Sequence, residues 1–277
     1  MKGFIFFILL ALSTNCFASP SAKESGSDST NYSNGADISL IGNTDQSFNE
    51  SIDALLVRMN LFNTFFSLYG VDPLVTNFKG IPIDGTPIEF TRKLLNIGFV
   101  DIPKPLSEGR HLFGSMFNHP ITISLLANPN NKVYFVNAHI RVESDLDAIN
   151  LMNQICGEFY FSTDYYPKTK CSFYSDNNPK EAINKMTTKP FTYIQIMNAE
   201  EEELITKRIK TGLIKRMPLY QDTDSTINFL TKCFVNFYKA YLMSHRIIHV
   251  ASKQDSSGIV FSIGYVNFIN FPNYKDF

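Results

Sequence analysis

Apolar residues recur at two spacings along this chain, and each spacing predicts a different kind of element. A repeat of three or four residues gives a helix one apolar face, and strict alternation gives a strand one apolar face. The first pattern predicts helices at 52–69, 88–97, 144–157, 179–186, 204–214 and 226–242. The second predicts strands at 78–83, 112–117, 121–125, 133–142, 170–174, 191–197, 246–251 and 258–269. Together they predict an α+β fold, in which short capped helices pack on a mainly antiparallel sheet.

The stretch 78–99 has the clearest local signals in the chain. Its apolar residues predict a strand, and Gly80 and Pro82 lie within it. Because proline has no amide hydrogen to donate, Pro82 favours an edge strand or the end of a strand. Asp84-Gly85 is a pair typical of tight turns. We therefore expect the chain to reverse direction before residue 86.

A short helix follows this turn. Thr86 and Glu89 have the spacing of a capping box, in which each side chain accepts a hydrogen bond from the backbone of the other residue. Pro87 occupies the first helical position, where a missing donor has no cost. Gly98 is a stop signal. The predicted apolar stripe contains Phe90, Leu94 and Ile97.

The same stretch carries a family resemblance. The pattern F-x-G-I-P-I-D-G, followed by a short F-x-x-x-L helix that ends in G-F, resembles the opening of uncharacterised exported bacterial proteins, which are common in gut-type Gram-negative anaerobes. The matching residues are Phe78, Gly80, Ile81, Pro82, Ile83, Asp84, Gly85, Phe90, Leu94, Gly98 and Phe99. The resemblance implies export and a small α+β fold, and it implies no reaction. It also favours strands before the C-terminus, whereas the length of the pattern at 226–242 favours a helix.

The N-terminal residues 1–18 predict an export signal, with Lys2 before a short apolar run. Cleavage after Ala18 fits the small residues there. The alternative is a lipidated Cys16, although Asn15 before it is not a small apolar residue. The protein would be tethered to a membrane only in the second case, because no later segment is long and apolar enough to span one.

Residues 19–50 are rich in Ser, Asn, Asp and Gly and predict a disordered tether. The remaining 51–277 predict one globular region. It contains two strand-then-capped-helix junctions, which leaves open two sub-units, 51–143 and 144–277, built from repeated β-α-β-β elements.

Composition excludes some partners. The net charge is −1, and no basic cluster favours nucleic acid or anionic lipid. The 25 Phe residues supply a large core, and charged residues make up 18%, below the usual quarter. A surface with few charges and exposed aromatic residues favours a protein or another cell-envelope component as the partner.

The cysteines predict at most one disulfide in the exported chain. Cys16 belongs to the signal, and Cys156, Cys171 and Cys233 follow it. An odd number leaves one thiol free, and the short loop makes Cys156–Cys171 the preferred pair. No CxxC motif is present, so the sequence predicts no zinc or redox site and no cofactor.

Catalytic and metal-binding motifs are weak. His245 and His249 could share a helix face and hold a metal, but the residues between them favour a strand, in which positions four apart lie roughly 13 Å apart. A Cys–His pair such as Cys156 or Cys171 with His139 lacks a nucleophile motif.

Polar residues elsewhere have simpler explanations. Ser115 lacks the G-x-S-x-G elbow. Glu143, Asp145 and Asp147 are explained by helix capping.

These patterns favour an exported binding or structural module without catalysis, whose strand edges and exposed aromatic residues make the contacts. One alternative is a hydrolase whose dispersed site gathers His139 or His119 with a carboxylate. Another is a carrier of a small apolar ligand, which needs a large apolar cavity.

Overall fold

The structure is a computed structural model that describes residues 64, 66–102, 111–169, 172–175, 177–216, 223–242 and 246–271. The chain divides into two compact units, 1–41 and 42–277, and every described residue belongs to the second. The predicted signal peptide, the predicted tether and residues 52–63 and 65 of the predicted helix 52–69 lie outside the described residues.

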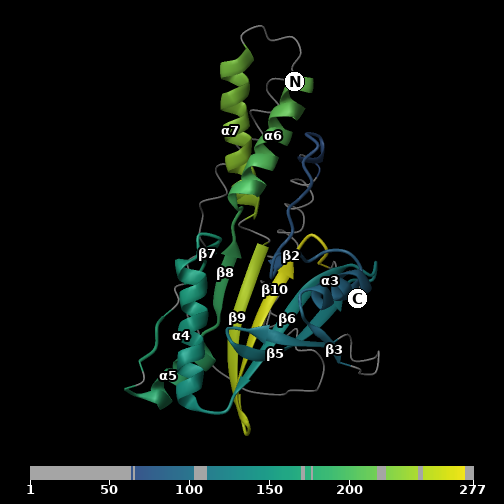
Figure 1. Cartoon of the computed structure of the whole chain (residues 1–277). Coiled ribbons are helices and arrows are strands. Elements are labelled where there is room, and N and C mark those ends of the chain that lie inside the picture. The colour runs from purple at the N-terminus through teal and green to yellow at the C-terminus, as the bar shows by residue number, and fades with distance from the viewer. Residues whose placement is uncertain are drawn as a thin grey trace, which may run out of the picture. The chain divides into compact units, whose positions relative to one another are not determined.

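An eight-stranded antiparallel sheet organises the second unit (Figure 1). Its spatial order is β3 (Val100–Ile102), β4 (His111–Met116), β5 (His119–Ala127), β6 (Val133–Val142), β10 (Gly258–Asn267), β9 (Arg246–Asp255), β8 (Phe191–Gln195) and β7 (Tyr165–Pro167). β6 pairs with β10, so residues from both predicted sub-units contribute to one sheet. The predicted α+β fold with a mainly antiparallel sheet is confirmed, and the internal repeat stays a prediction.

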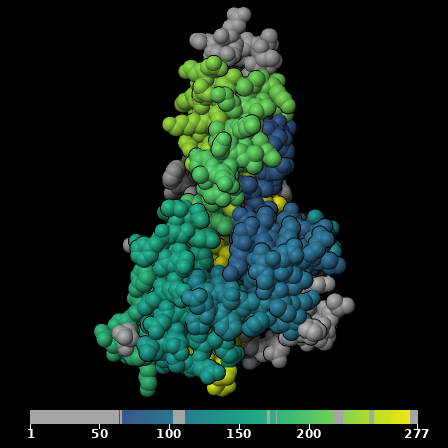
Figure 2. All heavy atoms as spheres, viewed as in Figure 1, coloured from purple at the N-terminus to yellow at the C-terminus, as the bar shows by residue number. Residues whose placement is uncertain are grey.

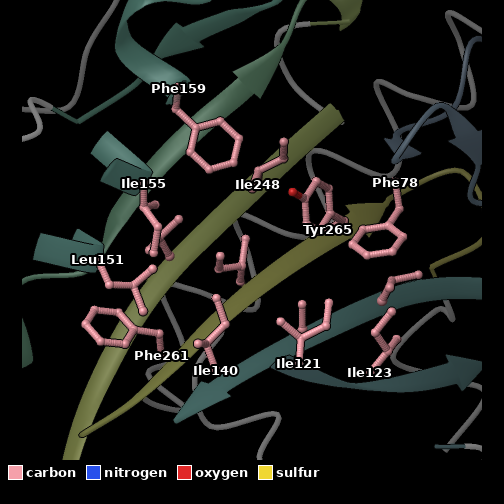
Figure 3. Packing of buried hydrophobic residues seen from close by; sticks show 14 of the residues in the cluster. Phe78, Ile121, Ile123, Ile140, Leu151, Ile155, Phe159, Ile248, Phe261 and Tyr265 are labelled. Carbon is pink, nitrogen blue, oxygen red and sulfur yellow. The ribbon is translucent and has the colours of Figure 1, made fainter. Parts of the chain in front are cut away.

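One face of this sheet is apolar and forms the core. Helices α3 (Pro87–Asn96), α4 (Asp145–Phe161) and α5 (Pro179–Thr188) contribute side chains to the same buried cluster as this face. In Figure 3, Leu151 and Phe159 of α4 lie beside Phe261 and Ile248 of the sheet. The space-filling view shows how side chains of α4 and of the stretch through α3 cover much of the sheet (Figure 2).

Two further helices pack against each other and against the segment that precedes β1. They are α6 (Ala199–Arg216) and α7 (Thr223–Leu242). The Phe66 ring meets the Tyr238 ring edge to face at 4.7 Å, and the Tyr238 hydroxyl donates to the Asp72 carbonyl at 3.0 Å. The helix predicted at 226–242 is confirmed, so the length of the pattern was the better guide there than the resemblance.

The predicted strand 78–83 is wrong in detail. A two-residue strand β1 (Asn77–Phe78) pairs with a two-residue strand β2 (Ile81–Pro82). Lys79 and Gly80 form the turn between them, with φ values of 49° and 75°. Positive φ at both central residues is the geometry of a tight hairpin turn, and glycine adopts it without strain. Pro82 thus lies in a two-stranded sheet, where its missing donor is tolerated.

The turn and helix after β2 follow the prediction closely. The Asp84 carboxylate accepts a hydrogen bond from the Gly85 amide at 2.7 Å. The Thr86 amide donates to Glu89 Oε2 at 2.8 Å, and the Glu89 amide donates to Thr86 Oγ1, so the capping box is confirmed. Gly98 follows the helix with a φ of 96°.

The predicted apolar stripe of α3 is partly wrong. Phe90 and Leu94 are fully buried, but Ile97 is half exposed, and Thr91 is buried in its place. Three residues past Leu94, the chain has already left the helix, so position 97 no longer faces the core.

Several predicted boundaries are also wrong. The helix after Ser144 passes through Gly157 and ends at Phe161, because packing of its buried face outweighs the low helix propensity of glycine. The predicted strands 112–117 and 121–125 are also displaced at the turn between them. β4 ends at Met116, Phe117 and Asn118 form the turn with positive φ, and β5 begins at His119. The described part of the predicted strand 170–174, residues 172–174, is irregular.

Candidate functional site

The second face of the sheet carries polar side chains and is named here the polar face. Paired residues of neighbouring antiparallel strands share a face, so the register builds two rows. One row is Thr122, His139 and Ser262. The other is Ser124, Asn137, Gly264, His249 and Thr192. The core cluster, with its residues from α3, α4 and α5, contains none of these side chains.

In the first row a histidine meets a serine. His139 Nδ1 lies 3.1 Å from Ser262 Oγ. Burial lowers the pKa of His139 below its ordinary value, and the nearby charge of His111 lowers it further. His139 is therefore a neutral imidazole at neutral pH, hydrogen-bonded to a hydroxyl group. No carboxylate is hydrogen-bonded to it among the residues that the structure describes.

The second row contains two buried polar atoms without a hydrogen-bond partner, Asn137 Oδ1 and His249 Nε2. Asn137 is 8% exposed. His249 Nδ1 lies 3.5 Å from Thr192 Oγ1 on β8, and since the two nitrogens of an imidazole point in different directions, Nε2 faces away from Thr192. Burial lowers the pKa of His249 as well. An unpaired buried polar atom has a desolvation cost that a native fold normally avoids.

A glycine separates these two side chains. Gly264 of β10 pairs with Asn137 on one side and with His249 on the other. The Phe135 ring lies over the glycine, and a Cβ placed on Gly264 would be 2.8 Å from Phe135 Cε2. Strands two apart in a sheet lie roughly 9–10 Å from each other. The space between Asn137 and His249 is therefore wide enough for a ring, and a phenylalanine ring occupies it.

Exposed aromatic residues gather at a second place, the end of α4. Tyr160, Phe161 and Phe173 are at least half exposed, and their ring centroids lie 5.2–6.4 Å apart. Tyr166, also exposed, lies in the edge strand β7. Exposed aromatic residues were expected from the composition, but their position depends on how far α4 extends.

The residues singled out in the sequence are distributed as follows. Gly80, Pro82, Asp84, Gly85, Thr86, Glu89 and Gly98 shape the hairpin, the turn and the ends of α3. Among the described residues, no hydrogen bond joins them to a residue of the two polar rows; the Gly85 carbonyl accepts from the Val133 amide, and the Asp84 carboxylate accepts from the Asn270 side chain. Their role in the described structure is to shape these turns and helix ends and, through Asp84 and Gly85, to join them to the sheet and to residue 270.

Of the two cysteines considered for a Cys–His pair with His139, the structure describes only Cys156, and it argues against that one. Cys156 is disulfide-bonded and fully buried in α4, on the apolar side of the sheet, whereas His139 belongs to the polar face. Cys233 is a free thiol. Cys171 lies outside the described residues, so the Cys156–Cys171 pairing stays a prediction.

The structure adds no support for the metal site or for the serine nucleophile considered from the sequence. His249 lies in a strand, as expected, and His245 lies outside the described residues. In the described ranges, no group of three or more His, Cys, Asp or Glu side chains could hold a metal ion. Ser115 is an exposed residue of β4. Ser144, Asp145 and Asp147 form the start of α4, where Ser144 Oγ accepts from the Asp147 amide.

Sequence reasoning missed Asn137, Gly264, Phe135 and Ser262. Each is an ordinary residue in a strand, and no local motif marks it. Only the pairing of β6 with β10, more than 100 positions later in the chain, brings them together. A signal was present in the alternation of 133–142, which places Phe135, Asn137 and His139 on one face of the strand.

Comparisons with protein-family models, with curated proteins and with solved structures found no match. Among the helices that the structure describes, none has both the length and the apolar character needed to cross a bilayer.

Proposed function

We propose that this chain is an exported binding module that works without catalysis, and that its polar face is the contact surface. The observation that carries the proposal is the pair of buried, unpartnered atoms, Asn137 Oδ1 and His249 Nε2. Folding tolerates unpaired polar atoms where they serve a partner that the isolated chain lacks. A ligand with hydrogen-bonding groups would supply that partner.

Export is the second part of the proposal. It is supported by the predicted signal at 1–18 and by the resemblance of 78–99 to exported proteins. A cell-envelope location also fits a chain in which Cys156 is disulfide-bonded, since disulfides persist in oxidising compartments.

The runner-up function, a hydrolase, has one observation in its favour, the His139–Ser262 hydrogen bond at 3.1 Å. A neutral histidine beside a serine is the beginning of a nucleophile–base pair. Such a pair also needs a third group to orient the base and donors for an oxyanion. In the described residues His139 has no carboxylate partner, and the amides of β10 are already paired in the sheet ladder. We therefore rank binding above hydrolysis.

The test of binding uses the protein purified from the cell envelope and the dialysable fraction of that envelope as probe. We expect the fraction to raise the midpoint of thermal unfolding of the wild type, because a ligand that binds the native state stabilises it. Asn137→Leu and His249→Phe should lose this shift, and the exposed variant Thr163→Ala should keep it. The proposal is overturned if the wild type shows no shift, or if all three variants show the same shift.

The test of export is the mass of the mature chain together with cell fractionation. Loss of residues 1–18, or a lipid on Cys16, in protein recovered from the envelope is the expected result. A cytoplasmic chain that still begins at Met1 would contradict it.

A further inference from the structure

The candidate cleft is the space over Gly264 on the polar face. It is bordered by Asn137 on β6 and His249 on β9, and the Phe135 ring fills it. Two apolar side chains on the same face adjoin it, Val266 beside Gly264 on β10 and Ile247 on β9, which pair with each other. A few polar groups set in apolar surroundings are typical of small-ligand sites.

The two unpartnered atoms restrict the chemistry of an occupant. Asn137 Oδ1 accepts a hydrogen bond. His249 Nε2 accepts or donates, depending on whether Nδ1 donates to the Thr192 hydroxyl or accepts from it. A hydroxyl group can both donate and accept, so it suits either tautomer. A ligand without hydroxyl or amide groups would leave both atoms unpaired.

Charge restricts the chemistry further. The two rows of polar residues contain no carboxylate and no ammonium or guanidinium group. The charges farther along this face are Lys253 of β9, four positions from His249, and the Arg141–Asp255 pair, which is joined at 2.9 Å. A charged ligand would be buried without a counter-charge, which is costly. The cleft therefore favours a neutral ligand.

The width favours a single ring. Asn137 and His249 belong to strands two apart, and the group now between them is a six-membered ring. A saturated ring with hydroxyl groups at its rim and C–H groups on its faces would place hydroxyls at both polar atoms and C–H groups on Val266 and Ile247. This is the chemistry of a sugar residue.

We propose that the cleft between Asn137 and His249 binds a neutral sugar residue once the Phe135 ring has turned away from Gly264. The inference rests on the proposed function and names its ligand class. Rotation of the ring is part of the proposal because both polar atoms are buried and the ring lies over the glycine between them. The open form is a minor conformer that the ligand selects.

The experiment is a titration of the purified protein with N-acetylglucosamine, methyl β-D-glucoside and methyl β-D-galactoside, followed by saturation-transfer NMR. Benzoate and benzylamine serve as charged ring controls. At least one sugar should bind, and neither control should. Asn137→Leu and His249→Phe should each weaken sugar binding at least fivefold, since each removes a hydrogen bond. His139→Gln, on the neighbouring row, should leave the affinity unchanged.

Phe135→Ala tests the closing ring. It should tighten sugar binding several-fold, because the cost of opening disappears. Equal or weaker binding by this variant, in a protein whose circular dichroism spectrum matches the wild type, would overturn the opening step.

The outcomes separate this inference from the proposed function. If no sugar binds but the envelope fraction still stabilises the wild type through Asn137 and His249, the ligand class is wrong and the binding function stands. If neither the sugars nor the envelope fraction has any effect, the sugar inference and the proposed binding function are both wrong. Ordered water then satisfies the two polar atoms. If a sugar binds equally well to Asn137→Leu and His249→Phe, its site lies elsewhere.

Discussion

At the scale of single residues, the start of α3 shows how a few atoms fix the beginning of a helix. The first amides of a helix have no partner within it. Thr86 and Glu89 satisfy two donors reciprocally, at 2.8 Å for the Thr86 amide. The hydrogen bonds from Thr86 also hold the pKa of the Glu89 carboxyl below its ordinary value. The cap therefore weakens as the pH falls through that lowered pKa.

Replacing Thr86 with alanine removes the side-chain acceptor of this cap. We expect Thr86→Ala to lower the free energy of unfolding by about 1 kcal/mol, within the range of about 0.5–2 kcal/mol for lost N-caps. Urea unfolding measures the change. Thr163→Ala, at an exposed turn residue, is the matched control and should stay within about 0.5 kcal/mol of the wild type. Equal effects in the two variants would contradict the prediction.

At the scale of elements, α4 has two faces with opposite roles. Phe159 is 3% exposed and stacks on Tyr193 with 4.8 Å between ring centroids. Phe161, two positions later, is 75% exposed. The helix continues past Gly157 because residues of its buried face, such as Phe159, still pack on the sheet. Its last turn also contains aromatic residues that are exposed to solvent.

These two phenylalanines form a matched pair for mutation. Phe159→Ala should lower the free energy of unfolding by about 3–5 kcal/mol, because it leaves a cavity in the core. Phe161→Ala should change it by less than about 0.5 kcal/mol, since little is buried there. Guanidinium unfolding of both variants gives the comparison. A large loss in Phe161→Ala would mean that its ring is covered in solution.

The elements also show which parts of the fold a sequence can predict. The cap at Thr86, the stop at Gly98 and the strand 133–142 depend on residues within a few positions, and these predictions are confirmed. The end of α4 and the boundary between β4 and β5 depend on what each element packs against, and these predictions are wrong.

The candidate site also depends on contacts between elements that are distant in the sequence. Asn137, Gly264 and His249 meet through strand register across β6, β10 and β9, and no spacing within the sequence encodes that register. Its histidine, His249, was noticed in the sequence, but for a metal role that depended on a helix. The alternation in each strand predicts which residues share a face, and it does not predict the neighbouring strand.

At the scale of the whole described unit, one buried arginine joins the sheet to α6. Arg246 begins β9, and its side chain is 1% exposed. Its guanidinium donates to both carboxylate oxygens of Glu201 in the first turn of α6, at 3.0 and 3.2 Å. It also donates to Gln195 Oε1, which in turn accepts from the Asn77 amide of β1. Sheet, helix and the small hairpin thus share one polar network.

Breaking this network should be costly. We expect Glu201→Gln to lower the free energy of unfolding by about 3–5 kcal/mol, because it leaves Arg246 buried without its counter-charge. The neighbouring Glu202 pairs with Lys239 at 2.6 Å, but both side chains are about 40% exposed. Glu202→Gln should therefore cost less than about 1 kcal/mol. Chemical denaturation of the two variants, followed by near-UV circular dichroism, measures both losses of unfolding free energy. Equal losses in the two variants would contradict the prediction.

The histidines of the polar face should make stability depend on pH. Burial lowers the pKa of His139 and of His249 in the folded state, while an unfolded histidine titrates near 6.5. Below that pH the unfolded chain binds more protons, so stability is full above about pH 6.5 and falls as the pH decreases toward the folded pKa values. Each proton contributes a slope of about 1.4 kcal/mol per pH unit at most.

Urea unfolding between pH 7 and pH 5 measures this slope. The double variant His139→Gln, His249→Gln should show a smaller slope than the wild type, with each single variant between them. A slope that the double variant leaves unchanged would assign the acid sensitivity to other groups.

The order of strands in the sheet also has a consequence for how the chain folds. β10 lies in the middle of the sheet, between β6 and β9, yet it follows every other described strand in the chain. Before residues beyond 245 are synthesised, β6 lacks its partner β10, and β8 lacks β9, the strand that connects it to the other strands of the sheet. Pairings of such long sequence separation form late, because loop closure must precede them. The nascent chain therefore cannot complete its sheet until its last strands emerge. Under the export proposed above, this incomplete state is the one that a membrane channel could accept.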